Sequence, residues 1–475
     1  MTLDYYRSSV WNVSTYNFPE EKVNLNIKVP AINKNAPKAP KCPAYILGAS
    51  KPLGAIRKIV HGRMEVAGVG KVETYLVRKI NAEIALYKEM TGHVKRSQAA
   101  ERLKKIMLEC FPTATILQYG SFAVGLDVSS SDLDFSVHIP GKEGRKMLED
   151  IEKAFKKLKE TFSKVKLICA NVPVLKLTDK KTGVEMDVCT GSLDGMRNTQ
   201  LLACYARVDP RIPLLIKAVK DWATKAKVEN SADGKLNGLS VCFLVISFLQ
   251  VGVQPCVAPN LQELVPELQG EYDIVSDEYG KKAEELVGNL GWESQNTMDC
   301  GELFLAFLAY YAVFDFENHW ISIRRGAVLP KRRDEEGKPL DGMPDDSKPI
   351  VIADPHLKTP KNNAYTLTKV KTFRRLQQEF KLSLERILEI KSLFEMGEMS
   401  ECRGKLNEEA RARDSQLVTE REEYIEKNGK DSWRTAPHAE QGSGQCFYEM
   451  FPDRIPKPNK PGKPKTVVAW PMMFD

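Results

Sequence analysis

Two aspartates that stand one residue apart are the side chains in this chain best suited to chemistry. Asp132 and Asp134 belong to the segment Asp132–His138, where apolar and polar residues alternate with the period of a β-strand. Residues two apart on a strand point to the same face, so the two carboxylates project together. Carboxylates held side by side repel one another, and a divalent cation between them offsets that repulsion. The pair therefore predicts a metal site on a strand.

A glycine–serine turn and a third aspartate stand where they could complete such a site. Gly120 and Ser121 follow a predicted strand at Thr115–Tyr119. Glycine lets the backbone approach a ligand closely, and the amide and hydroxyl of a serine beside a turn can hold a phosphate oxygen. Asp187, in a predicted strand over 184–188, can lie across the sheet from the first two aspartates. Together these residues indicate metal ions held beneath a nucleoside triphosphate.

The elements that must position these residues follow an α+β pattern with one open sheet. Before Leu193 the sequence predicts a helix over 143–162 and strands over 165–170 and 172–177. After it the chain becomes helical. The predicted elements there are helices from Arg197 and over 213–226, 239–250, 301–313 and 369–394, with a short strand over 320–323. We expect a sheet domain followed by a mostly helical domain.

Length and composition limit the classes of protein to which this chain can belong. The chain has 475 residues, enough for about three domains, and 42% of them are hydrophobic. The net charge of +7 permits a polyanionic partner without requiring one. The 10 cysteines form no CxxC pair and the histidines no HxxxH, which argues against structural zinc. With no signal peptide or membrane span, we expect no membrane association and a location in the cytoplasm, or else the nucleus.

The sequence divides into four expected parts. Residues 1–67 form an extended, poorly ordered lead-in, and 68–192 the catalytic sheet domain, which begins with helical periodicity up to residue 110. Residues 193–395 form the helical domain, with a charged, mobile insertion at 331–348. Residues 396–475 hold a charged helix near 406–426 and a basic, proline-rich tail.

The order of these motifs resembles the noncanonical poly(A) polymerases and terminal uridylyltransferases of the DNA polymerase β-like nucleotidyltransferase superfamily. The residues that carry the resemblance are the Gly-Ser turn, Asp-Leu-Asp eleven residues after Ser121, Asp187, and the segments 195–202, 220–223, 301–326 and 353–364. The resemblance covers roughly residues 95–395. It implies two lobes around a nucleotide cleft and two Mg²⁺ or Mn²⁺ ions on Asp132, Asp134 and Asp187. The ions would promote attack of an RNA 3′-hydroxyl on the α-phosphate of an NTP.

The resemblance also assigns nucleotide contacts by position. Gly120 and Ser121 would approach the terminal phosphates, and Asn198 and Thr199 would contact the ribose. Lys220 would neutralise the triphosphate. These assignments are expectations from the family pattern.

Three departures from that pattern bear on the choice of base. Thr224 stands where many relatives carry a second lysine, and Leu239 falls at the base-stacking aromatic position, with Phe243 the nearest aromatic. The recognition loop contains Asp354 and the pair Asn362-Asn363, which are expected to lie at the base. The loop has neither the His that often precedes its Asn in uridylyltransferases nor the DxxE pair of the trypanosomal enzymes, since Leu357 holds the second position.

These departures favour ATP, with UTP or mixed nucleotide use as the alternative. A weakly active RNA-binding scaffold subunit is a second alternative, motivated by Thr224 and Leu239. A third is another nucleotidyltransferase, such as an oligoadenylate synthase or a small-molecule transferase.

The expected RNA contacts are basic side chains on the rim of the helical domain. The candidates are Arg324, Arg325, Lys371 and Arg374, with Lys331, Arg332, Arg333, Lys369 and Arg375 in the same segments. The sequence contains no recognisable RRM or zinc knuckle. We therefore expect weak intrinsic RNA affinity, with specificity supplied by a protein partner.

Overall fold

A five-stranded sheet carries the three aspartates. The computed structural model describes residues 70–87, 93–169, 172–270, 272–312, 314–345, 348–356 and 360–390. The strands, in their order across the sheet, are β1 (Thr115–Tyr119), β2 (Leu133–His138), β5 (Glu185–Thr190), β4 (Val174–Asp179) and β3 (Phe162–Ile168). β2 and β5 are parallel, and the other pairs are antiparallel. The predicted strands and the α+β class are confirmed.

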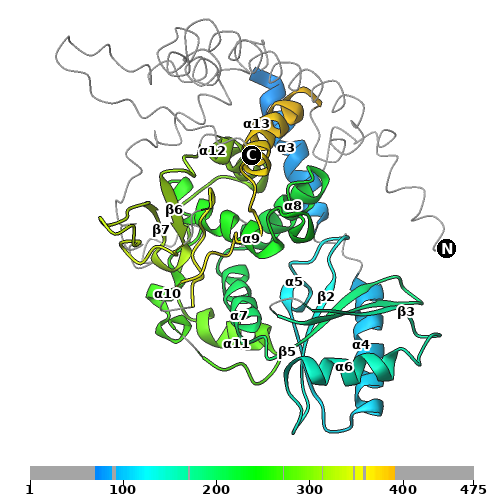
Figure 1. The fold of residues 1–475 in the computed structure, drawn as a ribbon. Helices are drawn as coiled ribbons and strands as arrows, with labels where there is room; N and C mark the ends of the chain where they lie inside the picture. The colour runs from blue at the N-terminus through cyan, green and yellow to red at the C-terminus, as the bar shows by residue number, and fades with distance from the viewer. Residues whose placement is uncertain are drawn as a thin grey trace, which may run out of the picture. The chain divides into compact units, whose positions relative to one another are not determined.

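Two helices cover one face of this sheet (Figure 1). They are α4 (His93–Cys110) and α6 (Gly144–Phe155), and their apolar side chains share one core with the inward residues of the sheet. Leu133 and Phe135 on β2, and Met186 on β5, belong to this core. The alternating residues of these strands, among them Asp134 and Asp187, therefore face the opposite side.

The helix predicted over 143–162 is shorter, because it ends at Phe155. Phe155 and Phe162 are seven residues apart, a spacing that places two residues on one face of a helix. In the structure a turn intervenes and Phe162 begins β3, yet the two rings still stack in the same core at 5.0 Å. The two rings thus belong to one core but to two elements, a helix and a strand.

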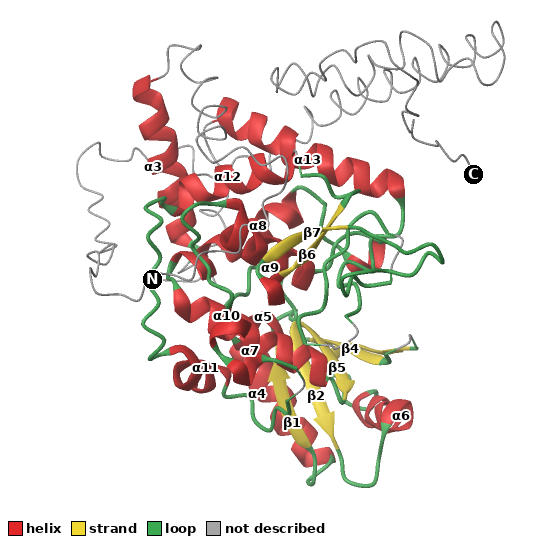
Figure 2. Cartoon of the chain, turned by 90° about the vertical axis from the view of Figure 1, so that its left-hand side faces the viewer, coloured by secondary structure: helices red, strands yellow, loops and turns green. Residues whose placement is uncertain are grey.

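Helices dominate the second lobe, which lies beside the sheet in Figure 2. Its main helices are α7 (Leu193–Val208), α8 (Arg211–Lys225), α9 (Gly238–Ser247), α12 (Cys300–Ala312) and α13 (Val370–Ile390). α9 continues into a π-helical turn, Phe248–Gly252. Rings of Trp222, Phe307 and Phe380 pack together and join α8, α12 and α13. The predicted helices are confirmed, although α7 begins at Leu193 and not at Arg197.

Several smaller elements of this lobe were not predicted. Among them are α10 (Leu261–Leu264), α11 (Tyr279–Val287) and β7 (Ala327–Pro330), which pairs with β6 (His319–Ser322), the short strand predicted over 320–323. The lobes are connected where Asp277 accepts from Lys104 Nζ at 2.8 Å and from the backbone amide of Gln118 at 3.4 Å. No helix in the described ranges has the length and apolar content needed to span a membrane.

Helix α3 (Gly70–Leu86) packs against the helical lobe, although the expected domain division places it in the sheet domain. Residues 68–192 were assigned to the sheet domain, but α3 packs against α12 and α8 of the helical lobe. Gly301 permits this approach, since a Cβ there would lie 2.7 Å from the carbonyl oxygen of Val77. The expected lead-in (1–67), the helix near 406–426 and the basic tail lie outside the described residues.

Candidate active site

The three aspartates are gathered by strand register. Asp134 is the direct partner of Tyr119 on β1 and of Asp187 on β5. Asp187 in turn faces Lys176 on β4, and Lys176 faces Lys166 on the edge strand β3. Direct cross-strand partners project from the same face. The row therefore runs from the carboxylates to two lysines on the face that α4 and α6 leave uncovered, while Asp132 precedes β2 by one residue.

Burial and mutual repulsion disfavour negative charge in this cluster. Burial, together with the charges of Asp132 and Asp187, raises the pKa of Asp134 well above its usual range. Burial also raises the pKa of Asp187, against the opposing effect of Lys176. Lys176 Nζ donates to both carboxylate oxygens of Asp187, at 2.7 and 3.0 Å. The site thus concentrates more negative charge than its surroundings neutralise.

This donor set fits a hard divalent cation. Three acceptor-only carboxylates that repel one another are the ligands that Mg²⁺ and Mn²⁺ use. As the side chains stand, no three metal-ligating groups in the described part of the chain converge on one point. At Asp187 the ammonium of Lys176 lies against the carboxylate, where a cation would bind. The Lys176 side chain is 41% exposed and can turn away as a cation is bound.

Gly120 is required by the position of Asp134. Its φ is +80°, and a Cβ at this position would lie 2.1 Å from Asp134 Oδ2. The Gly120 amide donates to Thr199 Oγ1 at 2.9 Å, and that hydroxyl donates to the Gly195 carbonyl at 2.7 Å. Thr199 was expected to contact ribose. It is buried, and its hydroxyl anchors the turn beside the carboxylates.

Two expected nucleotide contacts keep polar atoms that suit their assigned roles. Asn198 is buried, and its Oδ1 has no hydrogen-bond partner among the described residues. Such an acceptor suits a sugar hydroxyl. Lys220 Nζ donates to the Leu126 carbonyl at 3.2 Å and lies 3.5 Å from Ser131 Oγ. Burial and the neighbouring carboxylates raise the pKa of Asp134, and the charge of Lys220 opposes part of that rise, which places Lys220 near the carboxylates. Ser121 lies in the one-turn helix α5 (Gly120–Ala123).

The two departures on α8 and α9 have different surroundings. Leu239 is half-buried in the first turn of α9, and Phe243 is fully buried in the core, so this phenylalanine does not replace a stacking aromatic. Thr224 Oγ1 lies 3.2 Å from Glu229 Oε2. Glu229 was not identified from the sequence, and no local pattern marks it.

The two asparagines of the recognition loop have different surroundings. Asn362 is buried, and its Oδ1 accepts from the amides of Ile352 and Ala364 at 3.0 and 2.9 Å. Its Nδ2 donates to the Ile350 carbonyl at 2.9 Å, so the side chain holds the loop together and is not free to read a base. The Asn363 Nδ2 is buried and has no partner among the described residues. Asn363 is therefore the better base contact of the pair.

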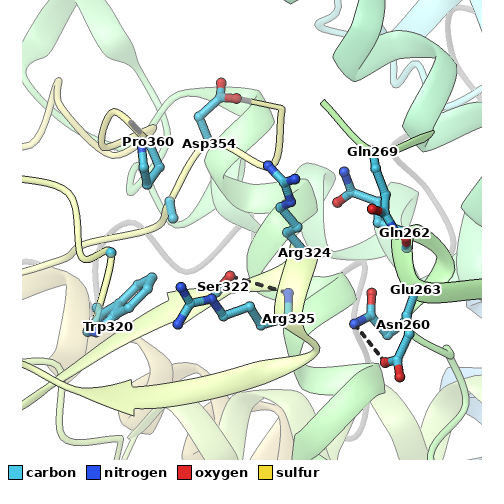
Figure 3. A pocket seen from close by; sticks show the side chains of 12 residues that line it. Asn260, Gln262, Glu263, Gln269, Trp320, Ser322, Arg324, Arg325, Asp354 and Pro360 are labelled. Atoms are coloured by element: carbon cyan, nitrogen blue, oxygen red, sulfur yellow. Dashed lines mark hydrogen bonds between the residues drawn. The ribbon is translucent and has the colours of Figure 1, made fainter. Parts of the chain in front are cut away.

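The same loop also contains Asp354 and His356. Asp354 accepts from the His356 amide at 2.9 Å and lines a pocket of about 600 Å³ with Arg324 and Arg325. Figure 3 shows Arg324, Asp354 and Gln262 around this space. His356 is fully buried, and burial lowers its pKa to about 4, so it does not offer a charged contact to uracil. The other predicted RNA contacts, Lys371 and Arg374, lie on α13, where Arg374 is exposed.

Lys166, Lys176 and Glu229 are the site neighbours that sequence reasoning missed. Alternation along β3 and β4 could have placed the two lysines on one face. Their alignment with Asp187 depends on strand order, which the sequence pattern did not specify.

Two family models match the chain. Residues 82–207 match the description "Poly(A) RNA polymerase, mitochondrial-like, central palm domain", and residues 299–360 match "Cid1 family poly A polymerase". The first region contains the three aspartates, and the second contains α12 and part of the recognition loop.

Curated relatives are poly(A) RNA polymerases. The gld-2 homolog A of Drosophila melanogaster is 38% identical over 169 residues, which is 36% of this chain and 12% of that protein. GLD2 of Danio rerio is 31% identical over 256 residues, or 51% of this chain and 50% of that protein. The matched region thus spans about half the length of the second relative and far less of the first.

Solved structures share the fold. The Cid1 poly(U) polymerase matches with a TM-score of 0.52 and 22% identity, over 64% of this chain and 92% of that one. GLD-2 from a GLD-2/RNP-8 complex matches with a TM-score of 0.51 and 22% identity, over 68% and 98%. Both similarities extend across the sheet domain and the helical lobe.

Proposed function

The chain belongs to the noncanonical poly(A) and poly(U) polymerase family, and on that premise we propose that it is a template-independent RNA 3′-terminal nucleotidyltransferase. The observation that carries the proposal is the register row that places Asp134 beside Asp187, against the Gly120 turn. A site with concentrated, half-neutralised carboxylates beside a phosphate-binding turn suits phosphoryl transfer.

The chain's own residues supply positioning and charge. Asp132, Asp134 and Asp187 would hold two Mg²⁺ or Mn²⁺ ions, which supply charge neutralisation for the attacking and leaving oxygens when bound. Ser121 and Lys220 would hold the triphosphate, and Asn198 Oδ1 would accept from a ribose hydroxyl. Phosphoryl transfer of this kind needs no side-chain nucleophile, and the proposal requires none.

ATP is the nucleotide that we propose. The uracil-reading His of the family pattern is absent, and a His-to-Asn mutant of Cid1 was solved with MgATP. Asn362 fixes the loop, so that the free Nδ2 of Asn363 can donate to a ring nitrogen of adenine. A carbonyl oxygen of uracil could accept the same hydrogen bond, and UTP therefore remains the alternative.

Single substitutions of the two asparagines should have different effects, one on nucleotide use and the other on stability. Asn363→Ala should reduce kcat/KM for the preferred NTP by about 3–10-fold, the value of one neutral hydrogen bond, with little loss of stability. Asn362→Ala should lower the free energy of unfolding by about 1–3 kcal/mol, since three loop groups lose a buried partner. Steady-state kinetics with each NTP and thermal melts measure the two effects. Equal stability losses would contradict this division of roles.

The lysines in the aspartate row suggest a path for RNA. Because the row continues from Asp187 through Lys176 to Lys166, phosphates upstream of the 3′ end can follow it across β4 and β3. Lys166→Ala should weaken binding of single-stranded RNA uniformly across sequences and reduce the slope of log K against log salt by about 0.7. The control is Lys146→Ala, because Lys146 is exposed on α6, over the opposite face. An equal change in both variants would contradict the path.

Primer extension with purified protein, Mg²⁺ or Mn²⁺ and each NTP separately tests the proposed function. Preferred use of ATP would support adenylyl transfer, and preferred use of UTP would support the alternative. Failure to extend with every NTP would favour the scaffold alternative. We also propose that a protein partner supplies RNA specificity, and a solved complex of GLD-2 with RNP-8 supports the presence of a protein partner.

A further inference from the structure

A carboxylate lies where a phosphate would be expected to bind. Glu229 Oε2 is 3.2 Å from Thr224 Oγ1. Its Oε1 would be 3.7 Å from a Cβ placed on Gly238, the first residue of α9. Burial raises the pKa of Glu229, and the charges of Lys220 and Lys235 oppose that rise by favouring its negative form. A helix N-terminus, a hydroxyl and lysines are the groups that bind phosphate in proteins.

The hydrogen bonds around Thr224 leave this carboxylate incompletely satisfied. The Thr224 hydroxyl has one proton, which is shared between the Lys220 carbonyl at 3.1 Å and Glu229 Oε2 at 3.2 Å. The same proton cannot fully serve Glu229. Glu229 is half-buried, and its negative charge also interacts unfavourably with Asp132. It is thus a charged group that two lysines and a helix end attract, while the one hydroxyl beside it is shared with a backbone carbonyl.

We propose that Glu229 is a resident anion that competes with the phosphates of the incoming NTP for Lys220 and the first turn of α9, and so sets the NTP affinity. This inference rests on the proposed function, because it assigns the triphosphate to Lys220. Glu229 reduces the positive potential that the triphosphate meets. Thr224, lacking a charge, does not compensate for it.

Glu229→Gln keeps the shape of the side chain and removes its charge. The Kd for a non-hydrolysable NTP analogue should fall by about fivefold, the scale of one partly screened charge interaction. The Kd for the corresponding nucleoside monophosphate should change by less than about twofold, because the competition concerns the terminal phosphates. The control is Glu278→Gln, which removes the same charge from an exposed residue next to α11.

Equilibrium binding keeps this test separate from the proposed function. If wild-type protein binds the NTP analogue but extends no primer, catalysis is at fault and the Glu229 measurement still stands. A Kd for the NTP analogue that rises in Glu229→Gln would overturn the inference, since Glu229 would then be an acceptor for the nucleotide. An unchanged Kd, or an equal fall in Glu278→Gln, would overturn it too. Thermal melts of both variants verify that they fold.

Discussion

Asp134→Asn is expected to abolish nucleotide addition while it raises the melting temperature. The carboxylate is a proposed ligand of both ions, and loss of such charge stabilisation costs several kcal/mol of barrier. At about 1.36 kcal/mol per tenfold, kcat should fall by about 10³-fold or more. The same carboxylate is disfavoured in the folded protein by burial and by Asp132 and Asp187. An amide relieves both effects, so activity and stability should move in opposite directions.

The stability gain should depend on pH with a definite sign. Because folding raises the pKa of Asp134, the folded state holds its proton more tightly than the unfolded state. The carboxylate therefore costs nothing below the ordinary carboxyl pKa, about 4, and destabilises increasingly as pH rises toward the raised pKa. Melts in a chelator should show the advantage of the Asp134→Asn variant at neutral pH, by roughly 2–4 °C per kcal/mol relieved, and little advantage at the acid end.

The control for this result is Asp150→Asn, because Asp150 lies on α6 and carries a lowered pKa caused by Lys142. That variant should keep its activity and gain no stability at neutral pH. A fully active Asp134→Asn protein would contradict the proposed mechanism. An inactive one with a lower melting temperature would contradict the electrostatic account alone.

Gly120→Ala should be the most damaging glycine substitution at the site. An added Cβ would lie 2.1 Å from Asp134 Oδ2, so the carboxylate or the turn must shift. The positive φ adds about 1–2 kcal/mol of backbone strain. We expect kcat to fall by about 10²-fold or more, since a misplacement of about 1 Å can cost that much.

Gly125→Ala distinguishes the effect of backbone strain from the effect of a contact with Asp134. Gly125 also has a positive φ, +68°, but an added Cβ there meets nothing within 4 Å. Gly125→Ala should lose a similar amount of stability, about 1–2 kcal/mol, and keep most of its activity. Thermal melts and primer extension on both variants measure the two contributions. Equal losses of activity would show that backbone conformation, and not the contact with Asp134, limits the site.

The local chemistry of the site could be predicted because it depends on short-range patterns. Alternation identified β2, and a period of two placed Asp132 and Asp134 together. Partners that depend on the assembled chain could not be predicted in the same way. Asn362 bonds to backbone groups of its own folded loop, and Thr199 bonds to the Gly120 amide from a distant helix. Family analogy assigned both to the nucleotide, and it did not predict their hydrogen bonds to the folded chain.

Sequence periodicity also could not predict which elements pack together when they are far apart in the chain. The helical periodicity up to residue 110 indicated helix in the segment of α3 but not its neighbour. That neighbour is α12, and Gly301 leaves space for the close approach. Similarly, the helix predicted over 143–162 includes Phe155 and Phe162, which belong to two elements that share a core.

The packing of α3 on α12 has a consequence for synthesis on the ribosome. Ile80 and Ile84 are fully buried in the folded protein, but α12 begins roughly 200 residues later in the chain. At about 5–20 residues per second, the nascent α3 waits roughly 10–40 s for its partner. Meanwhile the sheet domain between them can emerge and fold first. The apolar face of α3 is therefore a surface that a chaperone could occupy until translation of the helical lobe is complete.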